Sequence, residues 1–420
     1  MARVTGSDTV PDDFARYVAD SPTSYHAAAA ARDRFVAAGF TALEESAEWP
    51  TAPGGYVVVR DGAVVAWRVP AGAGPTTPFR VLGAHTDSPG FRLKPHAVVR
   101  ADGWERLNVE VYGGPILGSW FDRDLAVAGR VVDPDGTVRL VRTEAVARIP
   151  HVAIHLERTD DFRPDRQRHL LPVVGVDDGS DPADVRHWLR EALGDAVAGD
   201  LFLADTQPAA RIGVGGRLLA CGRMDNLTSV HAGLAGLLEA PEDAGHVAVL
   251  AAFDHEEVGS ASTSGAAGPL LEDVVGRIQE GLGASRSEAA RALRGSWLLS
   301  SDAGHLVHPG HPEKHDPGNR PRPGGGPLLK VSATQRYTTD ARGEALFAAT
   351  CAAAGVPWQH YVNVNTIPGG STIGPLAATR LGIPTVDVGV GLLSMHSARE
   401  LVHVDDLVAL HAAVAAFLAG

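Results

Sequence analysis

The chain has 420 residues, 45% of them hydrophobic and 21% charged, with a formal net charge of −13 at pH 7. This length exceeds that of one ordinary compact domain, so we expect two domains. The acidic balance argues against nucleic acid and against anionic membranes as partners, because both bind proteins through basic patches.

The two cysteines, Cys221 and Cys351, are too few for a disulfide framework or a cysteine-rich zinc cluster. The first residues lack the basic start and apolar run of a signal peptide, and no segment approaches about 18 uninterrupted apolar residues. We therefore expect a soluble, cytoplasmic protein.

Two helices are predicted at the start of the chain, within residues 11–39, and strands follow them. Residues 55–60 and 63–68 are joined by an Asp-Gly pair and predict a β-hairpin. An apolar strand at 79–83 then leads directly into a polar segment that contains a histidine and an aspartate.

The pattern of apolar and polar residues changes near residue 96, and the new pattern lasts to residue 206. Short alternating strands such as 107–112 and 129–136 predict a β-rich insert, whose polar tail at 157–184 is read as loop or partner surface. After it, apolar strands alternate with helices, including a helix at 227–239, which is typical of an α/β sheet covered on both faces.

The predicted organisation is therefore a mixed-sheet α/β catalytic domain, formed by residues 1–95 and 207–420, that the insert 96–206 interrupts. Residues 308–327 are too rich in proline and glycine for a regular element, and we expect an ordered loop near the site. Its histidines, His308, His311 and His315, are interpreted as surface or substrate-side residues rather than as a further metal site.

The pair Glu256-Glu257 directly follows the apolar strand 247–253. Burying two ionised carboxylates without compensation costs several kcal/mol per ion, so a metal ion is expected there. One glutamate would then bind metal, and the other would remain free for proton transfer. A helix cap could also explain such a pair, but not its place after a buried strand.

Four other clusters of ligand-type residues also follow apolar runs. In open α/β sheets, sites form beyond the carboxyl ends of the strands, so distant residues converge there. Mixed histidine and carboxylate ligands suit zinc or manganese, and a shared carboxylate suits two ions about 3.5 to 4 Å apart. The clusters are His85 with Asp87, then Asp225, then Asp302 with His305, and finally His396. We interpret Asp225 as the shared ligand, although in isolation it could simply cap the helix that follows.

Nine strings, spread in order over most of the chain, closely resemble those of the aspartyl aminopeptidases, metallopeptidase family M18. They are GAHTDSPGFRLKP, GGPILGSWFDRDL, IPHVAIHLER, GRMDNLTS, FDHEEVGS, SSDAGHLVHP, KVSATQRYTTD, GGSTIGP and MHSARE. The resemblance implies a di-zinc aminopeptidase, with manganese or cobalt as substitutes, that removes N-terminal Asp or Glu from peptides. It also implies that the insert is a dimerisation domain and that dimers assemble into a dodecamer.

The resemblance assigns five metal ligands. It implies that His85, Asp225 and Asp302 bind one ion, and that Asp225, Glu257 and His396 bind the other. It makes Glu256 the general base and Asp87 the carboxylate that orients a ligand imidazole. Spacing alone does not distinguish the adjacent glutamates. The resemblance further implies a non-proline cis peptide bond after Asp225.

Substrate contacts are also implied by the resemblance, at His155, His305, Lys330 and Tyr337. The histidine of the insert is expected to reach the active site of a neighbouring subunit, with His151 as the rival of His155. Both Lys330 and Arg336 remain open as the reader of an acidic side chain. Two other functions compete with this one: a deacylase or carboxypeptidase of related fold, and a catalytically silent scaffold that keeps its metals.

Overall fold

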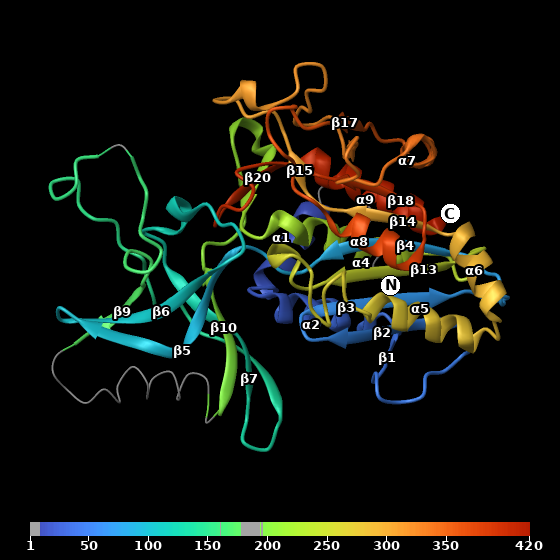
Figure 1. The fold of residues 1–420 in the computed structure, drawn as a ribbon, viewed down its shortest axis with the longest axis horizontal. Helices are drawn as coiled ribbons and strands as arrows, with labels where there is room; N and C mark the ends of the chain where they lie inside the picture. Colours follow the sequence, from blue (N-terminus) through green and yellow to red (C-terminus); the bar gives the residue numbers. More distant parts are fainter. Residues whose placement is uncertain (1–8, 160, 178–193, 195) are drawn as a thin grey trace.

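The computed structural model describes residues 9–159, 161–177, 194 and 196–420. A nine-stranded sheet forms the centre of the larger part of the molecule, on the right in Figure 1. Its strand order is β1-β2-β3-β13-β4-β14-β18-β16-β17. The bounds are β1 Thr41–Ala42, β2 Gly54–Arg60, β3 Ala63–Val69, β4 Phe79–His85, β13 Val247–Phe253, β14 Trp297–Ser301, β16 Leu328–Lys330, β17 Gln359–Tyr361 and β18 Thr385–Gly389.

Strands β13, β4, β14 and β18 run parallel to one another at the centre of this sheet. Every residue of β13 is buried. Alternate side chains of β13 enter two separate cores: Leu250 and its alternate neighbours face one, and Val249 and its alternate neighbours face the other. The sheet is therefore covered on both faces, which confirms the predicted α/β class.

Helices supply both covering layers. One core holds side chains of α1 (Thr9–Asp20), α2 (Ser24–Ala37), α4 (Met224–Glu239), α7 (Ala341–Ala354) and α9 (Val404–Ala419). The other holds side chains of α5 (Leu270–Gly281) and α8 (Ile373–Leu381), with α6 (Arg286–Gly295) beside it. Gly233 brings α4 close to the sheet, because a Cβ there would overlap Leu82 and Leu250.

A second sheet, of six antiparallel strands, stands to one side of the first (Figure 1). Its order is β8-β7-β10-β5-β6-β9, and its core surrounds Phe91, Leu107 and Trp120. The bounds are β5 Gly90–Ala101, β6 Trp104–Tyr112, β7 Leu125–Val132, β8 Val138–Arg142, β9 Val173–Val176 and β10 Ala198–Asp205, with a short 3-10 turn η1 at Leu117–Trp120. The ion pair between Arg130 and Asp61 joins this sheet to the hairpin β2-β3.

A third sheet brings distant loops together near the end of the central strands. Its order is β11-β12-β20-β19-β15. The bounds are β11 Ala210–Ile212, β12 Leu218–Cys221, β15 Gly304–His305, β19 Gly391–Leu393 and β20 Glu400–His403. Short 3-10 turns complete the described structure: η2 Val214–Gly216, η3 Glu256–Val258 and η4 Pro312–Lys314.

Most predicted elements are present, with differences at their ends. The hairpin and the strand at 247–253 are confirmed. The predicted strand 129–136 is wrong in its second half, because β7 ends at Val132. The chain then turns, and Gly136 within this turn has a φ of 87°. Within the polar tail, β9 forms a strand, and residues 160 and 178–184 lie outside the described residues. None of the described helices is both long and apolar enough to span a membrane.

Candidate metal centre

The carboxyl ends of three neighbouring parallel strands meet at one edge of the central sheet. In the sheet, β4 lies between β13 and β14, and the last residues of β4 and β13, His85 and Phe253, are partners in register. His85 therefore ends at the same edge as the loop that carries Glu256 and as Asp302, which directly follows β14. This is the place at which open α/β sheets form their sites.

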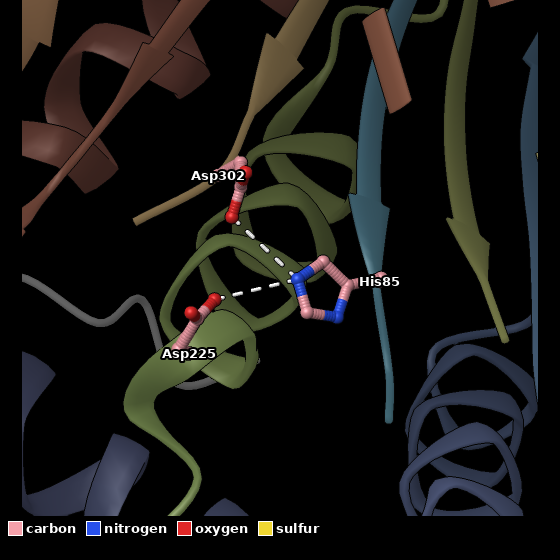
Figure 2. Close-up of side chains that lie close together, drawn as sticks. All are labelled: His85, Asp225 and Asp302. Atoms are coloured by element: carbon pink, nitrogen blue, oxygen red, sulfur yellow. Dashed lines mark ion pairs between the residues drawn. The ribbon is translucent and has the colours of Figure 1, made fainter. Parts of the chain in front are cut away.

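Among the described residues, two groups of possible metal ligands at this edge share Asp225, and a third joins His85 to Glu256 and Glu257. In the first group, His85 Nε2 lies 3.3 Å from Asp225 Oδ1 and 3.5 Å from Asp302 Oδ1 (Figure 2). In the second group, His396 Nε2 lies 3.4 Å from Asp225 Oδ2 and 3.4 Å from Glu257 Oε1. Asp225 thus presents one carboxylate oxygen to each group.

These spacings suit ligands around a common ion better than direct hydrogen bonds. A tetrahedral zinc ion with ligands at about 2.0–2.1 Å separates neighbouring ligand atoms by about 3.3 Å. Asp225 Oδ1 and Glu257 Oε1 are buried, and neither has a hydrogen-bond partner among the described residues. An orphaned buried oxygen is costly, and a cation bound in each group would satisfy the oxygen that faces it.

Both imidazoles are oriented with one nitrogen toward the carboxylates. His85 Nδ1 lies 3.0 Å from the carbonyl oxygen of Asp87, and His396 Nδ1 lies 3.0 Å from that of Gly114. A carbonyl can only accept, so each Nδ1 carries the proton and donates it. In the neutral rings each Nε2 then carries a lone pair, which is the form that binds a metal ion.

The carboxylates outnumber the positive charges of the centre. Burial raises the pKa of Glu256 to about 7 and raises that of Glu257 well above its usual value, and Asp225 adds to both shifts. Although burial acts to lower it, the pKa of His396 rises to about 10 because Asp225 and Glu257 lie beside it. Without a cation, these groups would therefore bind protons that compensate for the excess of negative charge. A divalent ion would supply the same compensation, so the residues fit such an ion.

Asp87 holds the segment that carries the paired glutamates. Its carboxylate accepts hydrogen bonds from the backbone N–H groups of Glu256 (3.1 Å) and Glu257 (3.2 Å) and from the Tyr112 hydroxyl (2.8 Å). The same carboxylate lies 3.4 Å from His85 Nδ1, which is closer to the Asp87 carbonyl. The structure thus places Asp87 beside His85, as expected, and gives its carboxylate a second task.

Glu400 supports the opposite side of the centre. It is buried and accepts hydrogen bonds from the backbone N–H groups of Asp225 (3.2 Å) and His396 (2.9 Å). Neither Glu400 nor Tyr112 was found from the sequence. Glu400 closes the string MHSARE four residues after His396, and this spacing was the available signal. Tyr112 ends an alternating strand and carries no distinctive signal.

The predicted substrate residues divide into two sets. Lys330 is buried at 2% exposure, where its Nζ donates to the Ala303 carbonyl (2.8 Å) and lies 3.5 Å from Asp302 Oδ2. His305 and Tyr337 line a cavity next to the centre. In the described part of the chain, no contact joins His155 to the ligand residues, and this histidine is exposed on the six-stranded part.

The remaining expectations near the site are met in part. The peptide bond between Asp225 and Asn226 is cis. His151, the rival of His155, is exposed and lies 2.7 Å from Asp122. The histidines of the proline-rich loop form no metal-type group among the described residues. His315 Nε2 instead accepts the backbone N–H of His308 (3.0 Å).

The fold and the centre define an α/β metallohydrolase. A family model described as "Aminopeptidase I zinc metalloprotease (M18)" matches residues 17–418. The chain is 48% identical to "Probable M18 family aminopeptidase 2" of Streptomyces coelicolor, over 97% of each chain. The chain therefore belongs to the M18 family of zinc metallo-aminopeptidases.

Solved structures agree with this assignment. The structure of the Ape4 and Nbr1 complex matches with a TM-score of 0.94 at 31% identity, over 98% of this chain and 86% of that one. The structure of the Saccharomyces cerevisiae mApe1 dodecamer matches with a TM-score of 0.84 at 25% identity, over 97% of this chain and 96% of that one.

Proposed function

We propose that the protein is a di-zinc aminopeptidase that releases N-terminal Asp or Glu from peptides. The observation that carries the two-ion proposal is the division of the Asp225 carboxylate between two ligand groups, one oxygen to each. Zinc would be the ion in both groups, with manganese or cobalt as possible substitutes. Bound there, the ions would polarise the scissile carbonyl and lower the pKa of a water between them.

Within this proposal Glu256 is the general base and Glu257 is the ligand. Glu257 is 6% exposed at its side chain and faces His396, whereas Glu256 is 17% exposed and its nearest approach to His85 Nε2 is 3.9 Å. Glu256 takes a proton from the attacking water and returns it to the leaving amine. Burial raises the pKa of Glu256 in the protein alone, and bound ions would offset this rise, which leaves Glu256 a carboxylate that can accept a proton and then release it.

Around these two glutamates, Asp87 acts on backbone atoms and Lys330 acts on the side chain of Asp302. Asp87 holds the N–H groups of both residues, which fixes the direction of their side chains. Lys330, the third proposed substrate contact, neutralises Asp302, while His305 and Tyr337 line the cavity that would hold the substrate. A donor such as the Tyr337 hydroxyl would stabilise the oxyanion of the tetrahedral intermediate.

We further propose that the insert mediates self-association and supplies His155 to a neighbouring subunit. His155 lies between two strongly exposed apolar residues, Ile154 (73%) and Leu156 (82%). Such a surface is typical of one that another protein covers. Dimers built in this way would form a dodecamer like that of mApe1, and light scattering of the purified protein measures the mass.

The function is tested with a panel of aminoacyl amides and the zinc-loaded protein. Faster turnover of Asp and Glu amides than of Leu and Ala amides is expected. The same amides with a blocked amine are the matched control, and the enzyme should leave them intact. Equal turnover of all four free amides would refute the acidic selectivity, and cleavage of blocked amines alone would favour a deacylase.

A further inference from the structure

Two loops without regular secondary structure border the cavity that Tyr337 lines. Residues 331–340 connect β16 to α7 and carry Tyr337, and residues 362–372 connect β17 to α8 and carry Gly369 and Gly370. The cavity measures about 270 Å³, and its lining includes residues of both loops. Because neither loop belongs to a helix or a sheet, other contacts have to fix the positions of the side chains that they present to the cavity.

One buried carboxylate, that of Asp387 on β18, accepts hydrogen bonds from both loops. Its Oδ2 accepts the backbone N–H (2.6 Å) and the hydroxyl (2.7 Å) of Thr338. Its Oδ1 accepts the hydroxyl of Thr372 (2.6 Å). The backbone N–H of Asp387 donates in turn to the hydroxyl of Thr339 (2.9 Å). Asp387 therefore joins one loop to the other through its two carboxylate oxygens.

The residue type at this position is explained by the loops rather than by the strand. Asp387 is 0% exposed, and its neighbours on β18, Val386 and Val388, are buried and apolar. Burying a carboxylate is costly unless other groups compensate for it, and the three donors to Asp387 are all neutral. A neutral amide would have only one oxygen, whereas a carboxylate has two and can hold both loops.

The strand that carries Asp387 also holds a ligand residue of the metal centre. The carbonyl oxygen of Val388 accepts the backbone N–H of Asp302 (3.0 Å). At Gly389 the two segments are so close that a Cβ would overlap the carbonyl oxygen of Asp302. Strand β18 is therefore a common frame for Asp302 and for the two loops, so the contacts of Asp387 set where the loops stand relative to the centre.

The side chain most affected by this arrangement is Tyr337, the residue directly before Thr338. Its ring is 6% exposed and lies 6.4 Å from the ring of Tyr361 and 5.4 Å from the Lys330 ammonium. Its hydroxyl makes no hydrogen bond with any residue that the structure describes, so it is free to donate to a substrate. A misplacement of about 1 Å in such a group costs about 10²-fold in rate.

We propose that Asp387 is a positioning residue of the aminopeptidase reaction, which sets the place of the Tyr337 hydroxyl by holding Thr338 and Thr372. This inference rests on the oxyanion role proposed for Tyr337 and deepens it. At 0% exposure Asp387 does not reach a substrate in the cavity, so its effect passes through the loops.

The test is a double-mutant cycle between Asp387→Leu and Tyr337→Phe in the full-length, zinc-loaded protein. Leucine has the branched shape of aspartate but no acceptor, so both loops lose their contact. With the aminoacyl amide that the unmodified protein cleaves fastest, kcat should fall about 10- to 100-fold in Asp387→Leu. It should fall about 10²- to 10³-fold in Tyr337→Phe. The double variant should match Tyr337→Phe, because the place of a hydroxyl no longer matters once it is absent.

A second variant keeps the test open if Asp387→Leu does not fold. Thr338→Val leaves the carboxylate in place and removes one of its hydrogen bonds, and kcat should again fall only while Tyr337 is present. Thr379→Val is the matched control, because Thr379 is exposed on α8 and its hydroxyl donates to the Pro375 carbonyl (2.8 Å). This control should leave kcat unchanged, and all variants should keep the zinc content of the unmodified protein.

The outcomes separate this inference from the proposed function. An equal loss from Asp387→Leu with and without the Tyr337 hydroxyl would show a purely structural role and overturn the inference. An unchanged kcat or a loss of zinc in Asp387→Leu would also overturn it, as would an unchanged kcat in Tyr337→Phe. Equal turnover of all free amides by the unmodified protein would instead refute the acidic selectivity, and the cycle would still decide the role of Asp387.

Hydrogen exchange of backbone amides gives a readout without turnover. In Asp387→Leu, exchange should become faster in both 331–340 and 362–372, because both loops lose their anchor. The reference is the loop 308–327, whose Gly324 and Gly326 N–H groups donate to another buried carboxylate, that of Asp406. Exchange there should not change. Faster exchange in all three segments, or unchanged exchange in either of the two loops, would contradict the inference.

Discussion

Replacing Glu256 by Gln tests the proposed division of labour at its centre. The substitution keeps the size of the side chain and removes its ability to accept a proton. A general base typically contributes about 10²- to 10⁴-fold to the rate, so kcat for the Asp amide should fall by that factor. At about 1.36 kcal/mol per tenfold change, this corresponds to a barrier higher by about 2.7–5.4 kcal/mol.

The metal content should not change in this variant. Glu256 lies 3.9 Å from His85 Nε2 at its nearest, whereas the atoms of each proposed ligand group lie 3.3–3.5 Å apart. Its backbone N–H still reaches Asp87, so the loop keeps its position. The matched control is Glu257→Gln, which should lose zinc because Glu257 faces His396 in the second group.

Two measurements decide the matter: zinc per chain by elemental analysis, and kcat at saturating substrate. Loss of zinc in Glu256→Gln, with retention in Glu257→Gln, would exchange the two roles. A kcat within about threefold of the unmodified protein would show that Glu256 is not the base, since even the weakest general bases contribute more.

Three further outcomes are expected. Asp225→Ala should reduce bound zinc from two ions per chain to none, because both groups use its carboxylate, and two retained ions would refute the bridge. Glu400→Ala should weaken zinc binding about 10- to 100-fold in competition with a chelator, because it frees the N–H groups of two ligand residues, and unchanged affinity would contradict this. The third outcome concerns His411, a buried residue whose Nε2 lies 2.9 Å from His231 Nδ1. Burial lowers the pKa of His411 well below its usual value. The unfolded chain protonates this residue below about pH 6.5 and the folded chain does not, so stability should fall as the pH falls. His411→Gln keeps a hydrogen-bond donor but cannot titrate. Denaturant titrations between pH 6 and 5 should show that the pH dependence of the unfolding free energy is smaller in this variant by about 1.4 kcal/mol per pH unit. An unchanged pH dependence would exclude His411 as the cause.

The residues that hold the ligand segments in place were much harder to predict than the ligand residues themselves. Residue types and strand ends pointed to His85, Asp225 and Asp302, because each stands where an apolar run stops. Glu400 and Tyr112 act through backbone groups or another carboxylate. The contacts of Tyr112 with Asp87 and of Glu400 with Asp225 span 25 and 175 residues, and no local pattern announces them. Only the contact of Glu400 with His396, four residues away, left a local signal.

The cations near the site illustrate the same limit from another direction. From the sequence, Lys330 and Arg336 were the open choices for an acidic side chain. The structure shows Lys330 engaged by Asp302 and Ala303, and Arg336 exposed outside the cavity lining. Whether a cation is free or already paired depends on neighbours that only folding supplies.

The sequence by itself determined the α/β class, the apolar strands with their two faces, and the ligand types that follow them. These features are local, because burial on both faces of a strand and the end of an apolar run are written in neighbouring residues. The tertiary structure alone decided which oxygen of Asp225 faces which imidazole, and how exposed each of Glu256 and Glu257 is. Those distances follow from the order β13-β4-β14 and from the pairing of β12 with β20, which brings the segments of Asp225 and His396 together. Both pair strands far apart in the chain, which no local pattern specifies.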